Sequence, residues 1–479
     1  MKKSILNLVS IAFFGSFIGR GLRYLFNVVI ARGLGAEALG LFAFGMVIMK
    51  AGSVIARFGL DTATQKYIPI YRTNNEDAKV SGVTIFALSF SFFLGLILAI
   101  VGFIGLHFAQ SRFSFHTEIF IFLIGIPLFA SMMTGQIATT GFKETQYSVY
   151  IRDIVQPVTG ILFISIGAYY FGNVEVTIIG YVTSLGIGTL FAVYFLYRLG
   201  AFQAFPDLEI KKTLLFGGPV AIVAVAQYIV SWTDILMLGY FVSPTNIGRY
   251  QAAYQTSLLL IIVLGAVNSI FPTVASDLYS EGKMRELEQM YSTVTKWITY
   301  FSILGLVFII IYTSEILLFF NINAQSAQTA LIILTVGQAI SASTGPVGFL
   351  LTMSGYERLE TINTITIALL NIVLNFVLIQ LYGIIGAAIA TGLSLLLLNL
   401  FRLTEIALVH NIQPYNFQYW KGGFSILIST VFLLVISPFA SGSLILTAFV
   451  GSVALVLFLI STLLLGFSEQ DRKLIKTVQ

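Results

Sequence analysis

Residues 11–35 read IAFFGSFIGRGLRYLFNVVIARGLG, a run long enough to cross a bilayer that carries Arg20 and Arg23 in its middle. A spanning helix needs about 20 mainly apolar residues. An arginine at the centre of such a helix costs roughly 2.5 to 3.5 kcal/mol on translocon-insertion scales, so it pairs with an acid or faces water. The environment of these two arginines therefore bears directly on function.

The composition is that of an integral membrane protein. Of the 479 residues, 57% are hydrophobic and 10% are charged, whereas soluble domains contain about 25% charged residues. The chain has no cysteine, and its three histidines are scattered, so we expect no metal site and no cofactor. The net charge of +5 comes from short basic runs between apolar segments, so we expect no nucleic-acid partner.

Apolar windows of about 20 residues predict the number of membrane crossings. Fourteen such windows occur, at 5–31, 38–60, 81–106, 117–140, 148–171, 175–197, 214–241, 246–273, 296–320, 327–353, 361–382, 384–408, 421–440 and 443–466. The predicted fold class is therefore an all-α polytopic membrane protein with about 14 transmembrane helices.

The basic residues predict the orientation of these helices. An even number of spans places both termini on one side, and with that side as the cytoplasm the inner connections and tails hold 20 of the 26 basic residues. The outer connections hold only Arg32, Arg112 and Arg249, and the other three lie inside predicted helices. This bias follows the positive-inside rule. We therefore expect a multi-pass protein of the cell membrane with both termini cytoplasmic.

Two short motifs indicate an internal repeat. ARGLGAEALGLFAF (31–44) and LGYFVSPTNIGRYQAA (238–253) each join two long helices through a Gly-x-aromatic step, Gly40-Leu41-Phe42 and Gly248-Arg249-Tyr250. Their offset covers six helices, an even number, so the repeats are parallel, as in many transporters. We expect six-helix bundles at 1–200 and 201–412, followed at 413–479 by two additional helices and a cytoplasmic tail.

One inner connection is long and amphipathic. Residues 277–297, DLYSEGKMRELEQMYSTVTKW, place apolar side chains at three- and four-residue spacing. This spacing predicts a helix that lies along the inner membrane surface.

The order of these motifs, continued by FGLDTATQKYIPIYR, GGPVAIVAVAQYIVSWTDILMLGYFV and FPTVASDLYSEGK, resembles the polysaccharide transporter (Wzx-like flippase) branch of the MOP superfamily. That superfamily also contains MATE drug exporters and MurJ lipid II flippases. The resemblance covers nearly the whole chain. It implies two six-helix bundles around a central cavity that opens alternately inward and outward. It also implies a cargo of oligosaccharide, linked through phosphate or pyrophosphate to a polyprenyl-type lipid, that moves from the cytoplasmic to the outer leaflet.

Three basic residues inside the first two helices are the candidate substrate-binding residues. Arg20 and Arg23 share one helical face, and Lys50 lies at a similar depth on the next helix. Neither helix carries an acid between Lys3 and Glu37 or between Glu37 and Asp61. One interpretation is a cationic cavity for a phosphate or pyrophosphate group, to which Arg offers a fork and Lys a point charge.

The alternative is structural, with Arg23 snorkelling outward and Arg20 paired with Asp234 on the seventh helix. Asp234 could also bind a coupling H⁺ or Na⁺, or close a gate against the arginines when the cavity is empty; a static bridge between the halves fits equally well. MATE exporters often carry an acid on the first helix for ion coupling, and this chain has none there. That difference favours lipid-linked cargo over drug cations, which a basic cavity would repel.

The later helices carry further polar residues. Gln338, Asn371 and Asn375 are candidates for lining a polar cavity and binding sugar hydroxyls, although such residues more often hydrogen-bond neighbouring helices. We expect Arg402 to pair with Glu405, and Arg152 with Asp153.

Two other functions compete with the flippase. One is a MATE-like, cation-coupled exporter of small molecules, and the other is a membrane glycosyltransferase or polymerase. The outer connections are too short for a large catalytic domain, and the chain shows neither a GxxxxGK[ST] loop nor a Ser/His/Asp set. We therefore expect a transporter that interacts with lipid-linked oligosaccharide and membrane lipids, and not an enzyme.

Overall fold

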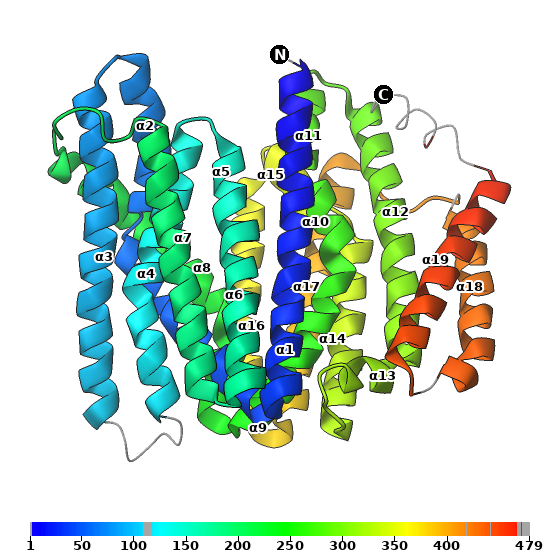
Figure 1. Cartoon of the computed structure of the whole chain (residues 1–479). Coiled ribbons are helices and arrows are strands. Elements are labelled where there is room, and N and C mark those ends of the chain that lie inside the picture. Colours follow the sequence, from blue (N-terminus) through cyan, green and yellow to red (C-terminus); the bar gives the residue numbers. More distant parts are fainter. Residues whose placement is uncertain (1, 109–115, 418, 441, 467–470, 472–479) are drawn as a thin grey trace. The chain divides into compact units, whose positions relative to one another are not determined.

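The protein is helical throughout the residues that its structure, a computed structural model, describes (Figure 1). These are residues 2–108, 116–417, 419–440, 442–466 and 471, with side chains described from residue 18 onward except at 116 and 230. The orientation prediction also used Arg112, Arg472, Lys473 and Lys476, which lie outside these residues.

The chain divides into two compact units, Met1–Gly248 and Arg249–Gln479. The first contains α1 (Lys2–Arg57), α2 (Leu60–Thr73), α3 (Asp77–Phe108), α4 (His116–Gly141), α5 (Thr145–Val149), η1 (Tyr150–Val155), α6 (Gln156–Ser165), η2 (Ile166–Phe171), α7 (Val174–Arg198), α8 (Ile210–Phe241) and the start of α9 (Pro244–Ser257). The second contains the rest of α9, η3 (Leu258–Ile261), α10 (Ile262–Asn268), α11 (Phe271–Ser280), α12 (Met284–Ile311), α13 (Thr313–Leu318), α14 (Gln325–Ser343), α15 (Val347–Met353), α16 (Glu357–Tyr382), α17 (Ile384–His410), α18 (Tyr419–Ala440) and α19 (Leu444–Leu464).

Helix α1 is two spanning helices joined at Gly35. Its 56 residues would extend about 84 Å as one straight helix, far more than the roughly 30 Å of a bilayer core. Gly35 has φ 89° and ψ 177°, a conformation essentially confined to glycine. Thirteen helices of the described residues are long and apolar enough to cross a membrane, with α1 counted once. The predicted all-α class with about 14 spans is therefore confirmed.

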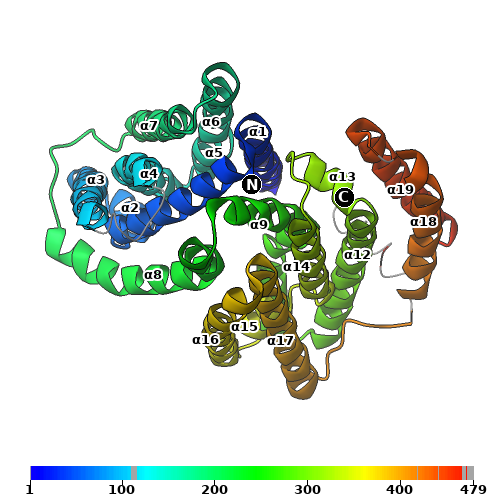
Figure 2. The same ribbon diagram turned by 90° about the horizontal axis from the view of Figure 1, so that it is seen from below.

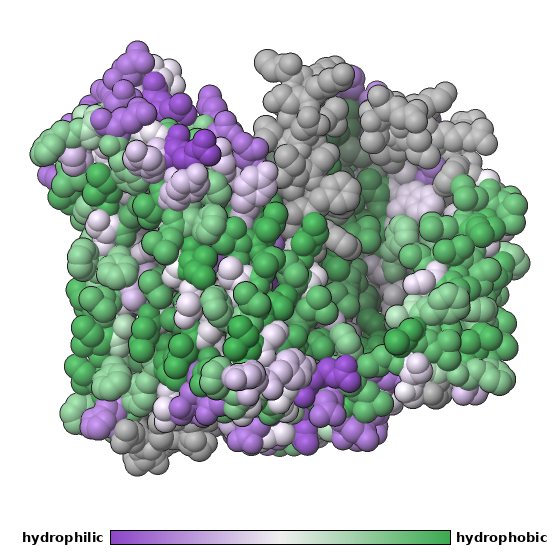
Figure 3. Space-filling model, in the orientation of Figure 1, coloured by the Kyte–Doolittle hydropathy of each residue, from purple (hydrophilic) through white to green (hydrophobic). Residues whose placement is uncertain are grey.

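Apolar side chains cover the outer surfaces of the long helices. On α3, for example, Phe93, Ile97 and Val101 are exposed although they are large and hydrophobic. Figure 3 shows such residues over α3, α6 and α7, with hydrophilic residues gathered at the helix ends. Because exposed apolar surface of this extent is stable in lipid and not in water, the chain is a multi-pass membrane protein.

The glycines that open the two Gly-x-aromatic steps, Gly40 and Gly248, lie against each other. A Cβ atom on Gly40 would come within 1.8 Å of the carbonyl oxygen of Pro244, and one on Gly248 within 1.8 Å of that of Ala36. Each glycine therefore lets the other helix approach at backbone distance. The motifs that indicated a repeat from the sequence thus form one reciprocal contact between α1 and α9.

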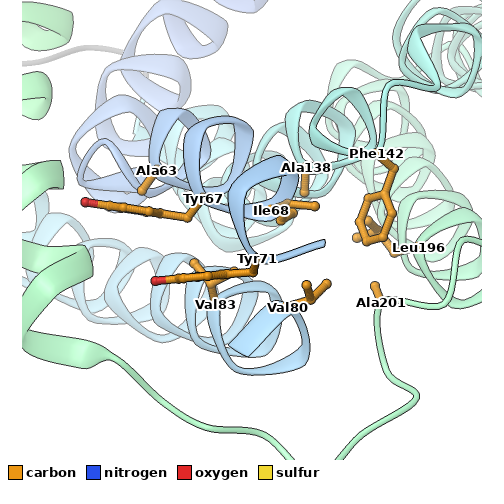
Figure 4. Packing of buried hydrophobic residues seen from close by; sticks show 10 residues of the cluster. All are labelled: Ala63, Tyr67, Ile68, Tyr71, Val80, Val83, Ala138, Phe142, Leu196 and Ala201. Atoms are coloured by element: carbon orange, nitrogen blue, oxygen red, sulfur yellow. The ribbon is translucent and has the colours of Figure 1, made fainter. Parts of the chain in front are cut away.

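Helix α2 is amphipathic and packs with one face on its neighbours. Ala63, Tyr67, Ile68 and Tyr71 recur at three- and four-residue spacing and belong to one buried cluster with residues of α3, α4 and α7 (Figure 4). The rings of Tyr67 and Tyr71 are stacked with centroids 5.8 Å apart. Seen from below, α2 lies beside α3, α4 and α8 (Figure 2).

Hydrogen bonds to the carboxylate of Glu209 connect α2 to the start of α8. The Tyr71 hydroxyl donates to the carboxylate of Glu209, and Lys212 Nζ donates to the same carboxylate at 2.9 Å. These two hydrogen bonds lower the pKa of Glu209. Burial, followed by the hydrogen bond to Glu209, raises the pKa of Tyr71.

The prediction of a separate surface helix at 277–297 is wrong. Helix α11 ends at Ser280, and α12 then runs without a break from Met284 to Ile311. Leu287 and Tyr291 are buried in a cluster with Phe271 of α11 and Leu350 of α15. The apolar spacing therefore reflects packing against other helices of the second unit.

Gly40→Ala is expected to destabilise the protein, because its methyl group would meet backbone atoms that cannot move independently. Overpacking of this kind costs roughly 1–3 kcal/mol, so the melting temperature of the purified protein should fall. Gly21→Ala is the matched control in the same helix, since no atom lies within 4 Å of its added Cβ, and it should melt at or above the wild-type temperature. Equal melting of the Gly40 variant and wild type would contradict the proposed close contact.

Candidate functional site: a cationic cluster in the N-terminal unit

Arg23 is neutralised by an acid from a distant part of the chain. Its Nη2 lies 3.2 Å from Oδ1 of Asp153, and Arg152 Nη2 lies 2.7 Å from Oδ2 of the same carboxylate. Asp153 is completely buried, whereas both arginine side chains are nearly half exposed. The predicted Arg152–Asp153 pair is confirmed. Asp153 also binds Arg23, so the acid that the first two helices lack is supplied by η1.

Local backbone structure brings Asp153 to Arg23. Asp153 lies in η1, a π-helical turn, and π-turns often occur at functional sites. One turn before Arg23 in α1, a Cβ on Gly19 would come within 2.7 Å of Asp153 Oδ1 and 3.0 Å of its Cα. A glycine at this position is therefore what allows α1 to reach the buried carboxylate.

Arg20 and Lys50 have no acidic side chain within ion-pair distance among the described residues. The Arg20 side chain is exposed. Lys50 Nζ lies 5.3 Å from the centre of the Trp232 ring, a cation–π contact, and is close enough to Arg23 for the two charges to repel. Of the three predicted basic residues, Arg23 alone forms an ion pair among the described residues, and it shares the Asp153 carboxylate with Arg152.

Asp234 lies on α8 and is buried. Its Oδ1 accepts a hydrogen bond of 2.8 Å from the backbone N–H of Ile235. Within the described part of the chain it forms no ion pair with Arg20, and the carboxylate bound to Arg23 is that of Asp153. The structural alternative that paired Arg20 with Asp234 is therefore not what the structure contains.

Of the three polar residues predicted on the later helices, Asn371 hydrogen-bonds a neighbouring helix. Asn371 Nδ2 donates to Ser394 Oγ of α17 at 3.0 Å, and Asn375 Nδ2 donates to Asn371 Oδ1 at 3.0 Å. Gln338 is buried within α14. The bond from Asn371 to Ser394 matches the interhelical alternative, whereas the bond from Asn375 stays within α16. A role in lining a cavity stays a prediction for all three residues.

The predicted Arg402–Glu405 pair is wrong. Arg402 Nε donates to Glu360 Oε2 at 2.8 Å, so its partner is on α16. Glu405 instead accepts a hydrogen bond of 2.6 Å from Asn363. A residue on a neighbouring helix offers Arg402 a bidentate geometry that a residue three positions along the same helix does not.

Sequence reasoning missed the roles of Asp153, Arg152 and Trp232 in this cluster. Arg152 and Asp153 are adjacent in the sequence, and this adjacency suggested only a local pair. The contact with Arg23 joins residues 130 positions apart. The sequence contained one sign of such a contact, namely that Arg152 and Asp153 lie at the start of the predicted spanning helix 148–171.

Comparison with known proteins agrees with the resemblance found in the sequence. The family model described as "Polysaccharide biosynthesis protein" matches residues 5–276. The chain belongs to this family. A second model, MatE, matches residues 219–377. A relative in Haloferax volcanii, named "Probable low-salt glycan biosynthesis flippase Agl15", is 25% identical over 440 residues, covering 89% of this chain and 88% of the relative.

Solved structures show the same fold. The lipid II flippase MurJ in an inward closed conformation superposes with a TM-score of 0.70 at 18% identity, over 97% of this chain and all of that one. An inward-facing MATE multidrug transporter of the MOP superfamily superposes with a TM-score of 0.66 at 15% identity, covering 81% of this chain and 94% of the other. The fold is therefore that of the MOP superfamily, as the resemblance implied.

Asp153→Asn should destabilise the N-terminal unit, because it removes the negative charge between Arg23 and Arg152. Breaking a fully buried pair costs about 3–5 kcal/mol, and the loss should be smaller here since both arginines are half exposed. Thermal unfolding in detergent measures the effect. Asp77→Asn, an exposed carboxylate in the first turn of α3, is the control and should change the melting temperature little. A melting temperature as high as that of the control would show that the ion pairs contribute no net stability.

Proposed function

We propose that the protein is a flippase that moves oligosaccharide linked to a polyprenyl phosphate or pyrophosphate from the cytoplasmic to the outer leaflet, for assembly of a cell-surface glycan. Its family and the name of its Haloferax volcanii relative, a probable glycan biosynthesis flippase, support this activity. We expect alternating access between inward-open and outward-open states, with both termini cytoplasmic.

The observation that carries the proposal is the cationic cluster in the N-terminal unit. Arg23 and Arg152 share the Asp153 carboxylate. Lys50 lies close to Arg23, and Arg20 precedes Arg23 by one turn of α1, although unneutralised charge is costly in a membrane protein. A phosphate or pyrophosphate group would supply the missing negative charge. The half-exposed Arg23 side chain presents a surface on which a phosphate oxygen could be bound by charge-assisted hydrogen bonds.

Asp153 would act as a positioning residue in this scheme. It holds Arg23 and Arg152 from the buried side, which leaves their exposed faces toward a ligand. It also offsets one of the two positive charges when no cargo is bound. Arg152 is accordingly added to the predicted binding residues Arg20, Arg23 and Lys50.

The positive charge of the cluster also favours the flippase over the two alternative functions. An exporter of small organic cations would need a neutral or acidic site, because the cationic cluster would repel such cargo. A glycosyltransferase or polymerase would need acids and bases that act on a donor sugar, and the cluster offers guanidinium and ammonium groups suited to binding. Asp234 remains the candidate for a coupling H⁺ or Na⁺, or for a gate.

Removing single charges from the cluster should weaken cargo binding more than it lowers the yield of folded protein. A charge-assisted hydrogen bond contributes roughly 1.5–3 kcal/mol, so Arg20→Ala should reduce affinity for a polyprenyl pyrophosphate about ten- to a hundredfold. Arg20→Lys should retain part of the affinity, and Lys50→Ala should weaken binding less. Binding and flipping are measured on the same purified variants in liposomes.

Arg198→Ala is the matched control, since it removes an exposed arginine at the end of α7. Unchanged binding by a folded Arg20→Ala, Arg23→Ala double variant would exclude the headgroup site. In the same assay, Asp234→Asn should slow flipping while leaving binding intact. Wild-type flipping by that variant would exclude both coupling and gating by Asp234.

The proposed orientation predicts which residues are accessible from each side of the membrane. Because the chain has no cysteine, a single introduced cysteine is the only thiol that a maleimide can label in the protein. Cysteines at Asn74 and Ser280 should react with an impermeant maleimide only after the inner side is opened, and one at Ser243 should react from outside; all three positions are exposed. Labelling from outside at Asn74 or Ser280 would reverse the topology.

A further inference from the structure

The C-terminal unit contains a cavity of about 210 Å³ where a helix is interrupted. Helix α14 ends at Ser343, Gly345 adopts φ +64°, and α15 begins after Pro346. The cavity lies along this break and is also lined by α10, α16 and α17 through Asn268, Glu360 and Arg402. An interrupted helix exposes polar groups that a continuous one would satisfy internally, which is how many transporters build binding sites.

One polar group at this cavity lacks a partner. Oδ1 of Asn268 is buried, and among the described residues it accepts no hydrogen bond. Such an orphaned acceptor costs about 1–3 kcal/mol, a cost that a ligand donor would remove. Asn399, in contrast, accepts a hydrogen bond of 3.0 Å from Thr344. Ser341 adds a hydroxyl to the lining.

The two charged side chains that line the cavity neutralise each other. Arg402 and Glu360 both line it and form a bidentate ion pair with each other, and they are the only charged residues in the lining. A phosphate would have to compete with Glu360 for Arg402, and a metal ion would have to compete with Arg402 for Glu360. The lining therefore suits a neutral ligand that both donates and accepts hydrogen bonds.

The volume of the cavity limits the size of the ligand that it can hold. The volume of 210 Å³ corresponds to about seven water molecules at roughly 30 Å³ each, and drug-sized ligands occupy larger pockets of about 300–1,000 Å³. A single pyranose ring, with hydroxyl groups at its edge and C–H groups on its faces, is a compact ligand of this kind. Phe349 lines the same cavity and is 40% exposed, so it offers an apolar surface to the C–H face of a sugar.

We propose that this cavity is a saccharide subsite that holds one neutral sugar residue of the cargo. Asn268 accepts a hydrogen bond from a sugar hydroxyl or acetamido N–H, Ser341 bonds a second hydroxyl, and the Glu360–Arg402 pair presents both acceptors and donors. The proposal rests on the flippase function and adds a recognition element for the glycan, separate in chemistry from the phosphate-binding cluster of the N-terminal unit.

The test compares two probes, polyprenyl pyrophosphate that carries one N-acetylglucosamine and polyprenyl pyrophosphate alone. Thr352→Cys introduces a single reporter thiol in the cavity lining; the Thr352 hydroxyl is bonded to the backbone of its own helix, so it is not needed by the ligand. The sugar-bearing lipid should slow alkylation of this thiol several-fold, and the sugar-free lipid should not. Ser314→Cys, at an exposed position outside the lining, is the control and should react at the same rate with either lipid.

Asn268→Ala should then reduce the preference for the sugar-bearing lipid by about two- to tenfold, the range expected for one neutral hydrogen bond. Binding of the sugar-free lipid by the same preparation should stay unchanged, which shows that the variant is folded. Equal protection of Thr352→Cys by both lipids, or an unchanged preference in Asn268→Ala, would overturn the saccharide subsite while leaving the flippase intact. If wild-type protein bound neither lipid, the proposed function would fail, and the subsite with it.

Discussion

The buried carboxylate of Asp153 is the constraint on which the N-terminal unit depends. A buried anion is stable only when it is paired and hydrogen-bonded, and Asp153 receives hydrogen bonds from both Arg23 and Arg152. This arrangement requires a glycine at position 19, where any side chain would collide with the aspartate. It also involves a π-helical turn that carries Arg152 and Asp153 together. One ion pair thus fixes the approach of α1 to η1 and the direction of two arginines.

Asp153 offsets only part of the positive charge beside it, and the proposed headgroup site rests on this excess. A static structural bridge would be expected to match charge with charge, as Glu360 does for Arg402 in the other unit. Around Asp153, however, the cations outnumber the ion-paired carboxylate, and Arg23 and Arg152 keep nearly half of their side-chain surface exposed. In the proposed function, the phosphate group of the cargo would offset this excess without another acid in the protein. The two sites therefore differ in chemistry: two arginines share one carboxylate around Asp153, whereas the charges that line the cavity of the C-terminal unit are paired.

The sequence predicted what local patterns determine and missed what distant contacts determine. Hydropathy gave the spanning helices closely, including the two halves of α1, because lipid imposes length and composition on each helix separately. Arg20, Arg23 and Lys50 were found because charge inside an apolar run is conspicuous. The bond from Arg23 to Asp153 was missed because nothing in either segment specifies its partner. Glu405 was predicted as the partner of Arg402 because it lies three residues further along the same helix. The structure pairs Arg402 with Glu360 instead, because Glu360 can bind the guanidinium in a bidentate geometry. Residues 284–297 were misplaced because amphipathic spacing looks the same whether the apolar face meets lipid or protein.

The Gly-x-aromatic steps show how a weak sequence signal can acquire a structural explanation. Two short motifs separated by about half the chain are poor evidence for duplication, and the division into bundles at 1–200 and 201–412 stays a prediction. The structure nevertheless shows Gly40 and Gly248 in reciprocal contact, each against the backbone of the other's helix. A reciprocal contact needs the same small residue at the same place in both partners, since a side chain on either one would separate the helices. Selection for close helix packing therefore accounts for the recurrence of glycine in the two motifs, and it does so whether or not the surrounding helices descend from a common repeat.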